Sequence, residues 1–416
     1  MQFLHHGYLR LPSAKKSPDI ERLLSYFHIY SGASPVDRTG TLTFPTRMKS
    51  IFPLPKMRDF RENYQDICEQ RAVDLLKLAD TLDVGIYVFW SGGVDSTCAL
   101  ASLLKHCKEP DRLTVLMNED SVLEYPLFYA QHVRKLRCQP TSRMTEVFVE
   151  NALVINGECN DQLFGSDIFE RAIALFGIEA VMAPLKRELI TSLYQHGSLF
   201  WLPIPPGITP IMNPDPPVPV SRENAVFLSG LMGRLLETAP VDIRTNFELL
   251  WWINFVLKWQ TVILRPLIFS KFPVSAQHIK TYYHPFFNTD EFQLWSMNNM
   301  DKRIRIKEGW RSYKWPCKDA IYSFTGDAEY RDYKKKFGSL RSLLLPLPFH
   351  KFIDEGFSFR EEFDWYEPQN DFTPATFDPS NRSLCEDAQS QRLLTDSRPS
   401  KPDGDILLEY AQRALY

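Results

Sequence analysis

Continuous apolar runs alternate with segments of helical spacing along the first half of the chain. The runs are typical of strands buried on both faces of a sheet, and they occupy residues 84–90, 113–118 and 152–156. Apolar residues recur at helical intervals in residues 58–80, 97–107 and 125–136. This alternation predicts β-α-β units, and therefore an α/β fold with a parallel sheet and helices on both faces.

The pattern changes in the second half of the chain. Residues 200–220 carry eight prolines and cannot form a helix, so we expect a linker or an ordered loop there. Residues 224–239 and 246–269 then show helical spacing. The aromatic residues of the second stretch are most simply core positions of a helix. The sequence thus predicts a mainly helical C-terminal region.

These patterns divide the chain into five expected segments. Prolines punctuate the first segment, and the last one is polar and proline-bearing, a composition that disfavours a packed core. The segments are an N-terminal arm or cap at residues 1–57, an α/β core at 58–200, a proline-rich linker loop at 201–220, a helical part at 221–345, and a polar, partly mobile tail at 346–416.

The bulk composition bounds the class of protein. The chain has 416 residues and a formal charge of −3, which suits two modest domains without bulk affinity for nucleic acid or an anionic membrane. That charge does not exclude a local basic site. No apolar run approaches the ~20 residues that a membrane span needs, and the first residues lack the order of a signal peptide. The seven cysteines form no CxxC pair, which favours reduced thiols over a zinc site. Reduced thiols in turn favour a cytoplasmic protein.

A turn rich in glycine and serine separates the first apolar run from the helix that follows it. Backbone N–H groups at the start of a helix lack partners and carry partial positive charge. Glycines let such a turn approach a ligand closely, and serine hydroxyls add donors. The sequence therefore predicts a nest for a phosphate-type anion, here called the anion loop, formed by Ser91, Gly92, Gly93, Val94, Asp95 and Ser96.

Asp95 is the unexpected member of the anion loop. The loop is not a Walker loop, because the Gly-Lys-Ser/Thr ending is missing. A carboxylate beside a phosphate is repulsive unless a divalent cation lies between them, so Asp95 implies Mg²⁺. The alternative is a helix N-terminus with small residues and an aspartate in its first turn.

The stretch SGGVDST resembles the SGGxDS pyrophosphate loop (PP-loop) of the ATP pyrophosphatases, a superfamily that includes asparagine synthetase. The resemblance implies an adenine nucleotide alpha hydrolase-like fold. It also implies that ATP is cleaved to AMP and pyrophosphate while an acyl or carbonyl oxygen is activated as its adenylate.

The stretch NGECNDQLFGSD at residues 156–167 is similar to the signature of asparagine synthetase, of which β-lactam synthetase carries a related version. The resemblance places Gly157 in the nucleotide site, makes Asp161 a second Mg²⁺ ligand, and puts Glu158 near the reacting carboxylate and the incoming amine. Two strand-end carboxylates facing one nest would hold a metal across the pyrophosphate, and a third acid could take a proton. The alternative is a turn in which Asp161 caps a helix.

Three further stretches resemble the same synthetase domain. Residues 282–295 are similar to its PFLDxxF segment, 312–321 to its K-x-x-x-R/K-x-A helix with Lys314 as a catalytic lysine, and 333–340 to a lysine-bearing loop that closes over the adenylate. In that loop we favour Lys335 over its two neighbouring lysines. Residues 302–341 hold twelve Lys or Arg against five Asp or Glu. Such a basic loop would stabilise charge on the phosphates, although a solvated basic surface and a nucleic-acid patch are alternatives.

The chain also departs from the asparagine synthetases. It begins Met1-Gln2-Phe3 and not with a nucleophilic cysteine, so we expect no glutaminase domain, and nitrogen from ammonia, another amine, or a separate amine-donor or carrier protein. The region between the two motifs is shorter. Gln162 and Ser166 replace an acid and a glycine of the signature. These departures predict a rebuilt acceptor pocket.

Together the motifs predict an ATP- and Mg²⁺-dependent ligase. It would adenylate a carboxylate or carbonyl oxygen, release pyrophosphate, and transfer the activated group to ammonia or another amine with loss of AMP. The rivals are a nucleobase or tRNA modification enzyme of the same superfamily and a non-catalytic nucleotide-binding protein. Retention of Ser91, Asp95, Glu158 and Asp161 together counts against the second rival.

Overall fold

The computed structural model describes residues 37–334 and 366–368, apart from gaps at 43–45, 49, 51, 118, 166–168, 170–171, 174–175, 187, 190, 193–221, 265 and 267–275. The predicted linker at 201–220, most of the predicted tail and Lys335 lie outside the described residues. The chain divides into two compact units. A helical unit comprises residues 1–57, 165–265 and 356–387, and an α/β unit comprises residues 58–164, 266–355 and 388–416.

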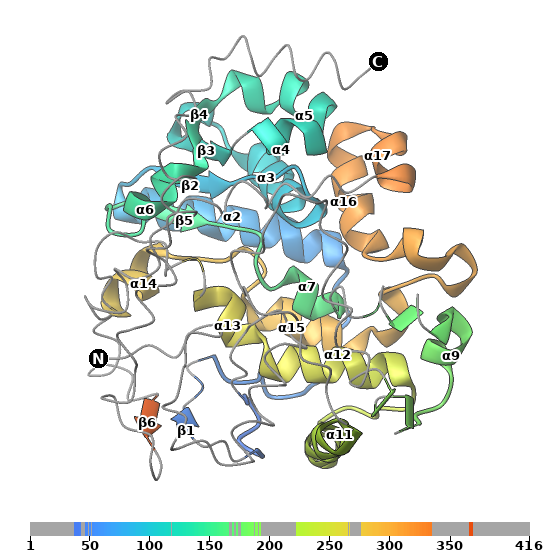
Figure 1. The fold of residues 1–416 in the computed structure, drawn as a ribbon. Coiled ribbons are helices and arrows are strands. Elements are labelled where there is room, and N and C mark those ends of the chain that lie inside the picture. The colour runs from blue at the N-terminus through green and yellow to red at the C-terminus, as the bar shows by residue number, and fades with distance from the viewer. Residues whose placement is uncertain are drawn as a thin grey trace, which may run out of the picture. The chain divides into compact units, whose positions relative to one another are not determined.

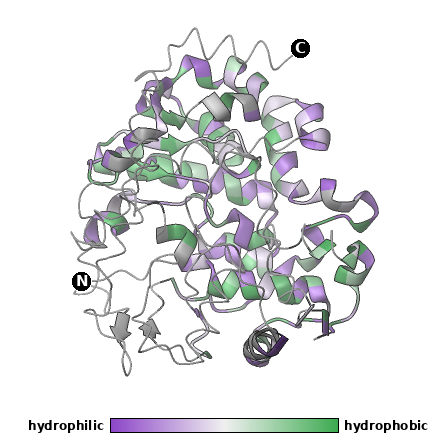
Figure 2. Cartoon of the chain, viewed as in Figure 1, coloured by the Kyte–Doolittle hydropathy of each residue, from purple (hydrophilic) through white to green (hydrophobic). Residues whose placement is uncertain are grey.

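A parallel sheet of four strands forms the centre of the α/β unit (Figure 1). Its order is β4-β3-β2-β5, with bounds β2 Ile86–Phe89, β3 Leu113–Met117, β4 Arg137–Pro140 and β5 Leu153–Ile155. Three strands lie within the predicted apolar runs and are largely hydrophobic in Figure 2, so the predicted α/β class with a parallel sheet is confirmed. The sequence did not predict β4, because RCQP is a polar edge strand without an apolar run.

The order of the strands creates a switch point between β2 and β5. The chain moves outward from β2 to β3 and β4, and then returns to the other side of β2 as β5. In open parallel sheets, ligands bind in the crevice outside the carboxyl ends of strands where the order reverses. The anion loop follows β2 and residues 156–161 follow β5, so both motifs lie at this switch point.

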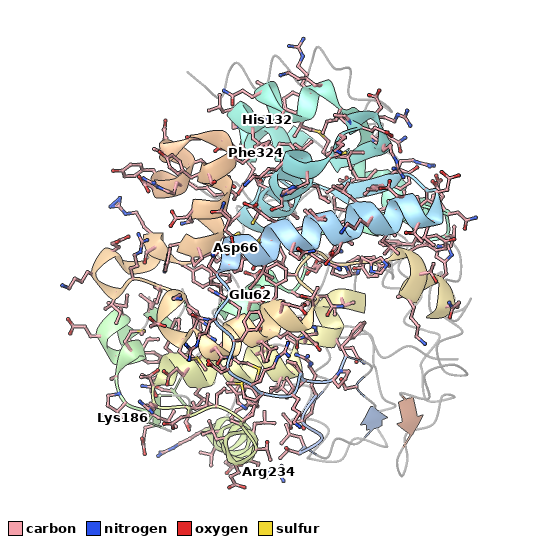
Figure 3. All side chains as sticks on the ribbon, turned by 180° about the vertical axis from the view of Figure 1, so that it is seen from behind. Glu62, Asp66, His132, Lys186, Arg234 and Phe324 are labelled. Atoms are coloured by element: carbon pink, nitrogen blue, oxygen red, sulfur yellow. The ribbon has the colours of Figure 1, made fainter. Side chains whose placement is uncertain are left out.

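Three helices of the α/β unit pack against one another: α2 (Tyr64–Leu82), α3 (Val94–His106) and α16 (Trp315–Thr325). The Asn63 side chain caps α2 by accepting a hydrogen bond from the N–H of Asp66, which Figure 3 shows at the beginning of that helix. Helix α3 begins directly after Gly93, so the predicted helix at 97–107 starts three residues earlier. The anion loop is therefore the N-terminus of α3.

The predicted helix at residues 125–136 is shorter in the structure. Helix α4 (Glu119–Glu124) precedes it, α5 spans Pro126–Gln131, and Val133–Lys135 form a 3-10 turn. His132 lies at the junction between α5 and that turn. Its ring is 4.8 Å from the ring of Phe324 on α16, and Figure 3 labels both side chains.

Residues 283–286 run beside β5 and extend the sheet locally. The N–H of His284 donates to the carbonyl of Val154 at 2.9 Å, and the N–H of Phe286 donates to the carbonyl of Asn156 at 2.8 Å. The remaining helices of the unit have the bounds α6 Met144–Val147, α7 Asn160–Phe164, α14 Ala276–Tyr282, α15 Asp290–Asn298 and α17 Ala328–Tyr333. Tyr64 packs its ring against an aromatic cluster made of Phe164, Phe287, Phe292 and Trp295.

The helical unit contains α9 (Ile178–Met182), α11 (Arg222–Glu237), α12 (Asn246–Leu257) and α13 (Trp259–Leu264), with an antiparallel pair of β1 (Thr46–Met48) and β6 (Tyr366–Pro368). The single helix predicted at 246–269 is divided at Lys258. The aromatic residues of this stretch that the structure describes are buried, as predicted for helical core. Among the described helices, none is both long and apolar enough to cross a bilayer.

Candidate functional site

The two serines of the anion loop hold its turn in shape. The Ser96 hydroxyl accepts a hydrogen bond from the N–H of Ser91 at 3.0 Å, and the two hydroxyl oxygens lie 3.0 Å apart. The Ser91 hydroxyl in turn accepts from the N–H of Gly93 at 3.3 Å. Both serines were predicted to donate hydrogen bonds to an anion. In the structure they form hydrogen bonds within the loop, and they stabilise the turn whose backbone N–H groups would face a ligand.

Gly92 occupies a position where only glycine fits. Its φ is +73°, and a Cβ there would press on the Ser121 carbonyl and lie 2.7 Å from the Cβ of Glu124. On the other side, the Tyr330 hydroxyl donates to the carbonyl of Gly92 at 3.0 Å. The anion loop is thus held between α4 and α17.

Gly157 brings the second motif against the first. A Cβ on Gly157 would lie 2.8 Å from the backbone nitrogen of Ser96 and 2.9 Å from the carbonyl carbon of Asp95. The absence of a side chain therefore lets the turn after β5 contact the first turn of α3. This contact positions Asp161, at the start of α7, beside Asp95.

Lys314 joins the two aspartates. Its Nζ lies 2.6 and 2.7 Å from the carboxylate oxygens of Asp95 and 2.6 Å from an oxygen of Asp161. Lys314 is 6% exposed and caps α16 in a left-handed conformation, with φ 60° and ψ 30°. The three residues, all predicted from separate stretches of sequence, form one charge cluster.

The cluster has an excess of negative charge, because two carboxylates share one ammonium. Burial raises the pKa of Asp95; Lys314 opposes this shift, and the charge of Asp161 adds to it. Burial also disfavours the charged form of Lys314, but the two carboxylates outweigh it and hold the lysine pKa well above its usual value. A further positive charge would therefore be stabilised here.

Sequence reasoning missed Asn160 and Tyr64. The Asn160 amide donates to an oxygen of Asp95 at 2.6 Å, and its own carbonyl oxygen accepts from the Tyr64 hydroxyl at 2.6 Å. Asn160 is fully buried. In the stretch NGECNDQLFGSD, the resemblance gives a role to Gly157, Glu158 and Asp161 but none to Asn160, so nothing in the sequence linked this asparagine to Asp95. Its role follows only from the packing of α2, α3 and α7.

Glu158 lies in the turn after β5 and is half-buried. Its backbone N–H donates to the side-chain oxygen of Asn156 at 3.1 Å, and the Asn156 amide donates to the Tyr283 hydroxyl at 2.8 Å. Cys159, the next residue, has a φ of +77°. The turn is therefore bent sharply between Glu158 and Asp161.

The basic segment reaches the anion loop through α17. Lys334 forms an ion pair with Glu124, the residue that packs under Gly92, and both side chains are buried. Lys335, the favoured lysine of this run, lies outside the described residues. Lys318, on α16, is the second basic residue of the K-x-x-x-R/K-x-A stretch that begins at Lys314, but sequence reasoning gave it no role of its own. Burial and the nearby Lys334 lower the pKa of Lys318 to about 8.

The donors near Asp95 fit Mg²⁺. The carboxylates of Asp95 and Asp161 converge on the ammonium of Lys314, and Mg²⁺ in nucleotide sites takes one or two carboxylates together with waters and substrate phosphates. Within the described parts of the chain, no three His, Cys, Asp or Glu side chains gather into a group that could hold a metal. The protein would therefore supply part of a coordination shell at Asp95 and Asp161.

Three cysteines cluster beneath the site. The sulfurs of Cys68 and Cys98 lie 3.8 Å apart, and the Asn160 amide lies 3.5 Å from the sulfur of Cys317. All three thiols are buried, and burial raises the pKa of both Cys68 and Cys317. The raised pKa favours the protonated thiols. Because the thiolate is the reactive form, these cysteines are packed as unreactive core groups.

Of the predicted site residues, Asp95, Asp161, Lys314 and Gly157 thus meet from three segments of the α/β unit. The anion loop, the turn after β5 and the start of α16 converge at Asp95. Comparisons with protein families, with curated proteins and with solved structures found no match to this chain.

Proposed function

We propose that this chain is an ATP-dependent ligase that adenylates a carboxylate or carbonyl oxygen and transfers it to ammonia or another amine. The proposal includes an adenine nucleotide alpha hydrolase-like arrangement of the sheet, with helices on both of its faces. The substrates would be a small-molecule carboxylate and an amine, with ATP as the activating nucleotide.

One observation carries the proposal: two strand-end loops meet at the switch point of the sheet and place Asp95 and Asp161 on one cation, the ammonium of Lys314. A helix N-terminus beside paired carboxylates suits a nucleotide that arrives with a divalent cation. A structural turn would need neither a buried lysine between the acids nor the contact of Gly157 with the backbone of Asp95.

In the adenylation step, the N-terminus of α3 would bind the phosphate chain through its backbone N–H groups. Asp95 and Asp161 would hold Mg²⁺, which neutralises phosphate charge when bound. The acceptor oxygen would attack the α-phosphorus of ATP, forming the P–O bond of the adenylate and releasing pyrophosphate. Lys314, already paired with both acids, would keep their carboxylates oriented toward this position.

In the transfer step, an amine would attack the acyl carbon of the adenylate, and AMP would leave with its bonding electron pair. An ammonium-type nucleophile must first lose a proton. Glu158 would accept that proton, because it is a partly exposed carboxylate in the same turn as Asp161. The Asn156 side chain would set its position through the backbone N–H of Glu158.

A sulfur-transfer enzyme is the less supported reading of the same loops. Such an enzyme needs an accessible thiolate, whereas Cys68, Cys98 and Cys317 are at most 1% exposed. Their burial argues against a thiol nucleophile from this cluster beside Asp95.

Release of pyrophosphate from ATP tests the proposal. The purified chain is incubated with ATP, Mg²⁺, and pools of carboxylic acids and amines. We expect pyrophosphate and AMP from the wild-type chain, and none from Asp95→Asn, which removes a charge from the cluster while keeping an oxygen acceptor for Asn160. Asp301→Asn is the control, since Asp301 is exposed on the same unit.

The outcomes separate the rival functions. Wild-type pyrophosphate release by Asp95→Asn would contradict the assignment of the anion loop. Turnover that requires added RNA would favour a nucleobase or tRNA modification enzyme. Nucleotide binding without turnover in any pool would favour a non-catalytic binding protein.

A further inference from the structure

Three lysines lie on α16 or at the ends of α16 and α17, and their charges are compensated to different degrees. Lys314 faces two carboxylates, Asp95 and Asp161. Lys334 is paired with the buried Glu124. Lys318 differs from both, because its Nζ donates to a backbone carbonyl, that of Arg311, at 2.6 Å.

The surroundings of Lys318 do not neutralise its charge. Its neighbours on α16 are Lys314 and the protonated thiol of Cys317, and those on α17 are Lys334 and Asp332. Asp332 is itself paired with Arg331, whose two guanidinium nitrogens lie 2.7 and 2.9 Å from its oxygens. Lys318 therefore carries a half-buried positive charge among two other ammonium groups.

The position of Lys318 relates it to the anion loop. The N–H of Lys318 donates to the carbonyl of Lys314, the N-cap of α16, at 3.1 Å, and the sulfur of the preceding Cys317 lies 3.7 Å from the carbonyl of Val94 in the anion loop. The Lys314 side chain reaches Asp95 at 2.6 Å. Lys334, the other neighbour of Lys318, binds the glutamate that packs under Gly92.

We propose that Lys318 binds the phosphate chain of the nucleotide, an assignment that rests on the proposed function. A half-buried cation without a carboxylate partner is unfavourable until an anion arrives, and a nucleoside triphosphate supplies that anion. Lys314 and Lys334 would hold the acids and α17 in place, and Lys318 would contact the ligand. Helix α16 and its N-cap would then contribute Lys314 as a positioning residue and Lys318 as a phosphate-binding residue.

This role has a pH signature. Burial and the two neighbouring ammonium groups lower the pKa of Lys318 to about 8 in the free protein. A bound phosphate favours the charged lysine and raises that pKa. Nucleotide affinity should therefore be complete below pH 8 and fall as the pH rises above it.

Calorimetric titration with α,β-methylene-ATP and Mg²⁺ at pH 7.5 and 9.5 tests the inference. Lys318→Met should weaken binding at pH 7.5 by about ten- to a hundredfold, since a hydrogen bond between charged groups is lost. Lys318→Arg should keep its affinity at pH 9.5, where the wild type loses affinity, because arginine stays charged. Lys307→Met is the matched control, since Lys307 is exposed on the same unit.

The results distinguish this inference from the proposed function. If the wild-type chain does not bind the analogue at all, the proposed function itself fails. If the wild type binds and Lys318→Met binds equally well at pH 7.5, the role of Lys318 is overturned. A loss of affinity at pH 9.5 that is as large for Lys318→Arg as for the wild type would overturn it as well.

Discussion

Lys314 combines an unfavourable backbone with a central electrostatic position. A non-glycine residue in the left-handed region costs on the order of 1–2 kcal/mol, and Lys314 adopts that region with φ 60°. Its N–H donates to the carbonyl of Arg303 at 3.1 Å, and its side chain joins Asp95 and Asp161. Strain of this kind is retained where the surrounding structure over-determines the residue, which is common at functional sites.

The two acids after β5 should differ in kinetics. Asp161→Asn should increase the Mg²⁺ concentration required for half-maximal pyrophosphate release, because one metal ligand is lost. Glu158→Gln should keep its affinity for α,β-methylene-ATP while amide formation slows by about 10²–10⁴, the range for a lost proton acceptor. Glu62→Gln is the control, since Glu62 is exposed just before the beginning of α2 (Figure 3). Unchanged Mg²⁺ dependence in Asp161→Asn would remove it from the metal site.

Gly92 allows a test that separates backbone conformation from close packing. Gly92 and Gly326 both have positive φ, at 73° and 69°, but a Cβ has open space only at Gly326. Gly326→Ala should therefore cost about 1 kcal/mol of unfolding free energy from backbone strain. Gly92→Ala should cost at least about 1–3 kcal/mol more from overpacking against α4, as measured by urea unfolding. Equal losses would mean that the loop can move away from Glu124.

At the scale of elements, α17 is attached to the anion loop by several contacts. The rings of Tyr330 and Tyr125 stack with centroids 3.6 Å apart and planes 9° apart. The Tyr125 hydroxyl donates to Asp327 at 3.0 Å, and Tyr330 donates to Gly92. Together with the Lys334–Glu124 pair, these contacts connect the C-terminal part of the α/β unit to the loop that follows β2.

A double-mutant cycle on Glu124 and Lys334 should reveal a strong coupling. Either Glu124→Leu or Lys334→Met alone should lower the unfolding free energy by about 3–5 kcal/mol, because the remaining buried charge loses its oppositely charged partner. The double variant should recover most of that loss. The more exposed pair of Glu69 and Lys105 is the control, with a coupling below about 1 kcal/mol. Additive single effects at Glu124 and Lys334 would show that the pair is not a unit.

At the scale of the whole molecule, partly buried histidines should make stability depend on pH. Burial lowers the pKa values of His132, His278 and His284 below the usual value. The unfolded chain therefore binds protons more readily than the folded one, so the unfolding free energy should fall as the pH decreases from 8 through about 6.5.

His132→Leu isolates one of these contributions. Its ring lies between those of Phe128 and Phe324, and among the described residues its Nε2 has no hydrogen-bond partner. The variant should lose less stability than the wild type between pH 8 and pH 5.5, as measured by urea unfolding at both values. A pH dependence equal to that of the wild type would mean that His132 binds a proton as readily in the folded chain as in the unfolded one.

Local patterns of apolar residues were sufficient to predict three of the four strands in the sheet of the α/β unit. The runs at residues 84–90, 113–118 and 152–156 predicted β2, β3 and β5, because strands buried on both faces need continuous apolar residues. The same reasoning failed for β4, whose residues are polar, and for the helix at 246–269, which divides at Lys258. Edge position and tertiary packing decided these two cases.

The sequence by itself determined which acids, glycines and lysines follow the buried strands, because local composition records where a chain must turn and expose polar groups. Only the tertiary structure decided which of them meet. Lys314 and Asp95 are separated by 219 positions, and Asn160 reaches Asp95 across 65. Such contacts depend on the order β4-β3-β2-β5 and on the packing of α2, α3 and α16, which arise from the burial of surfaces distant in sequence.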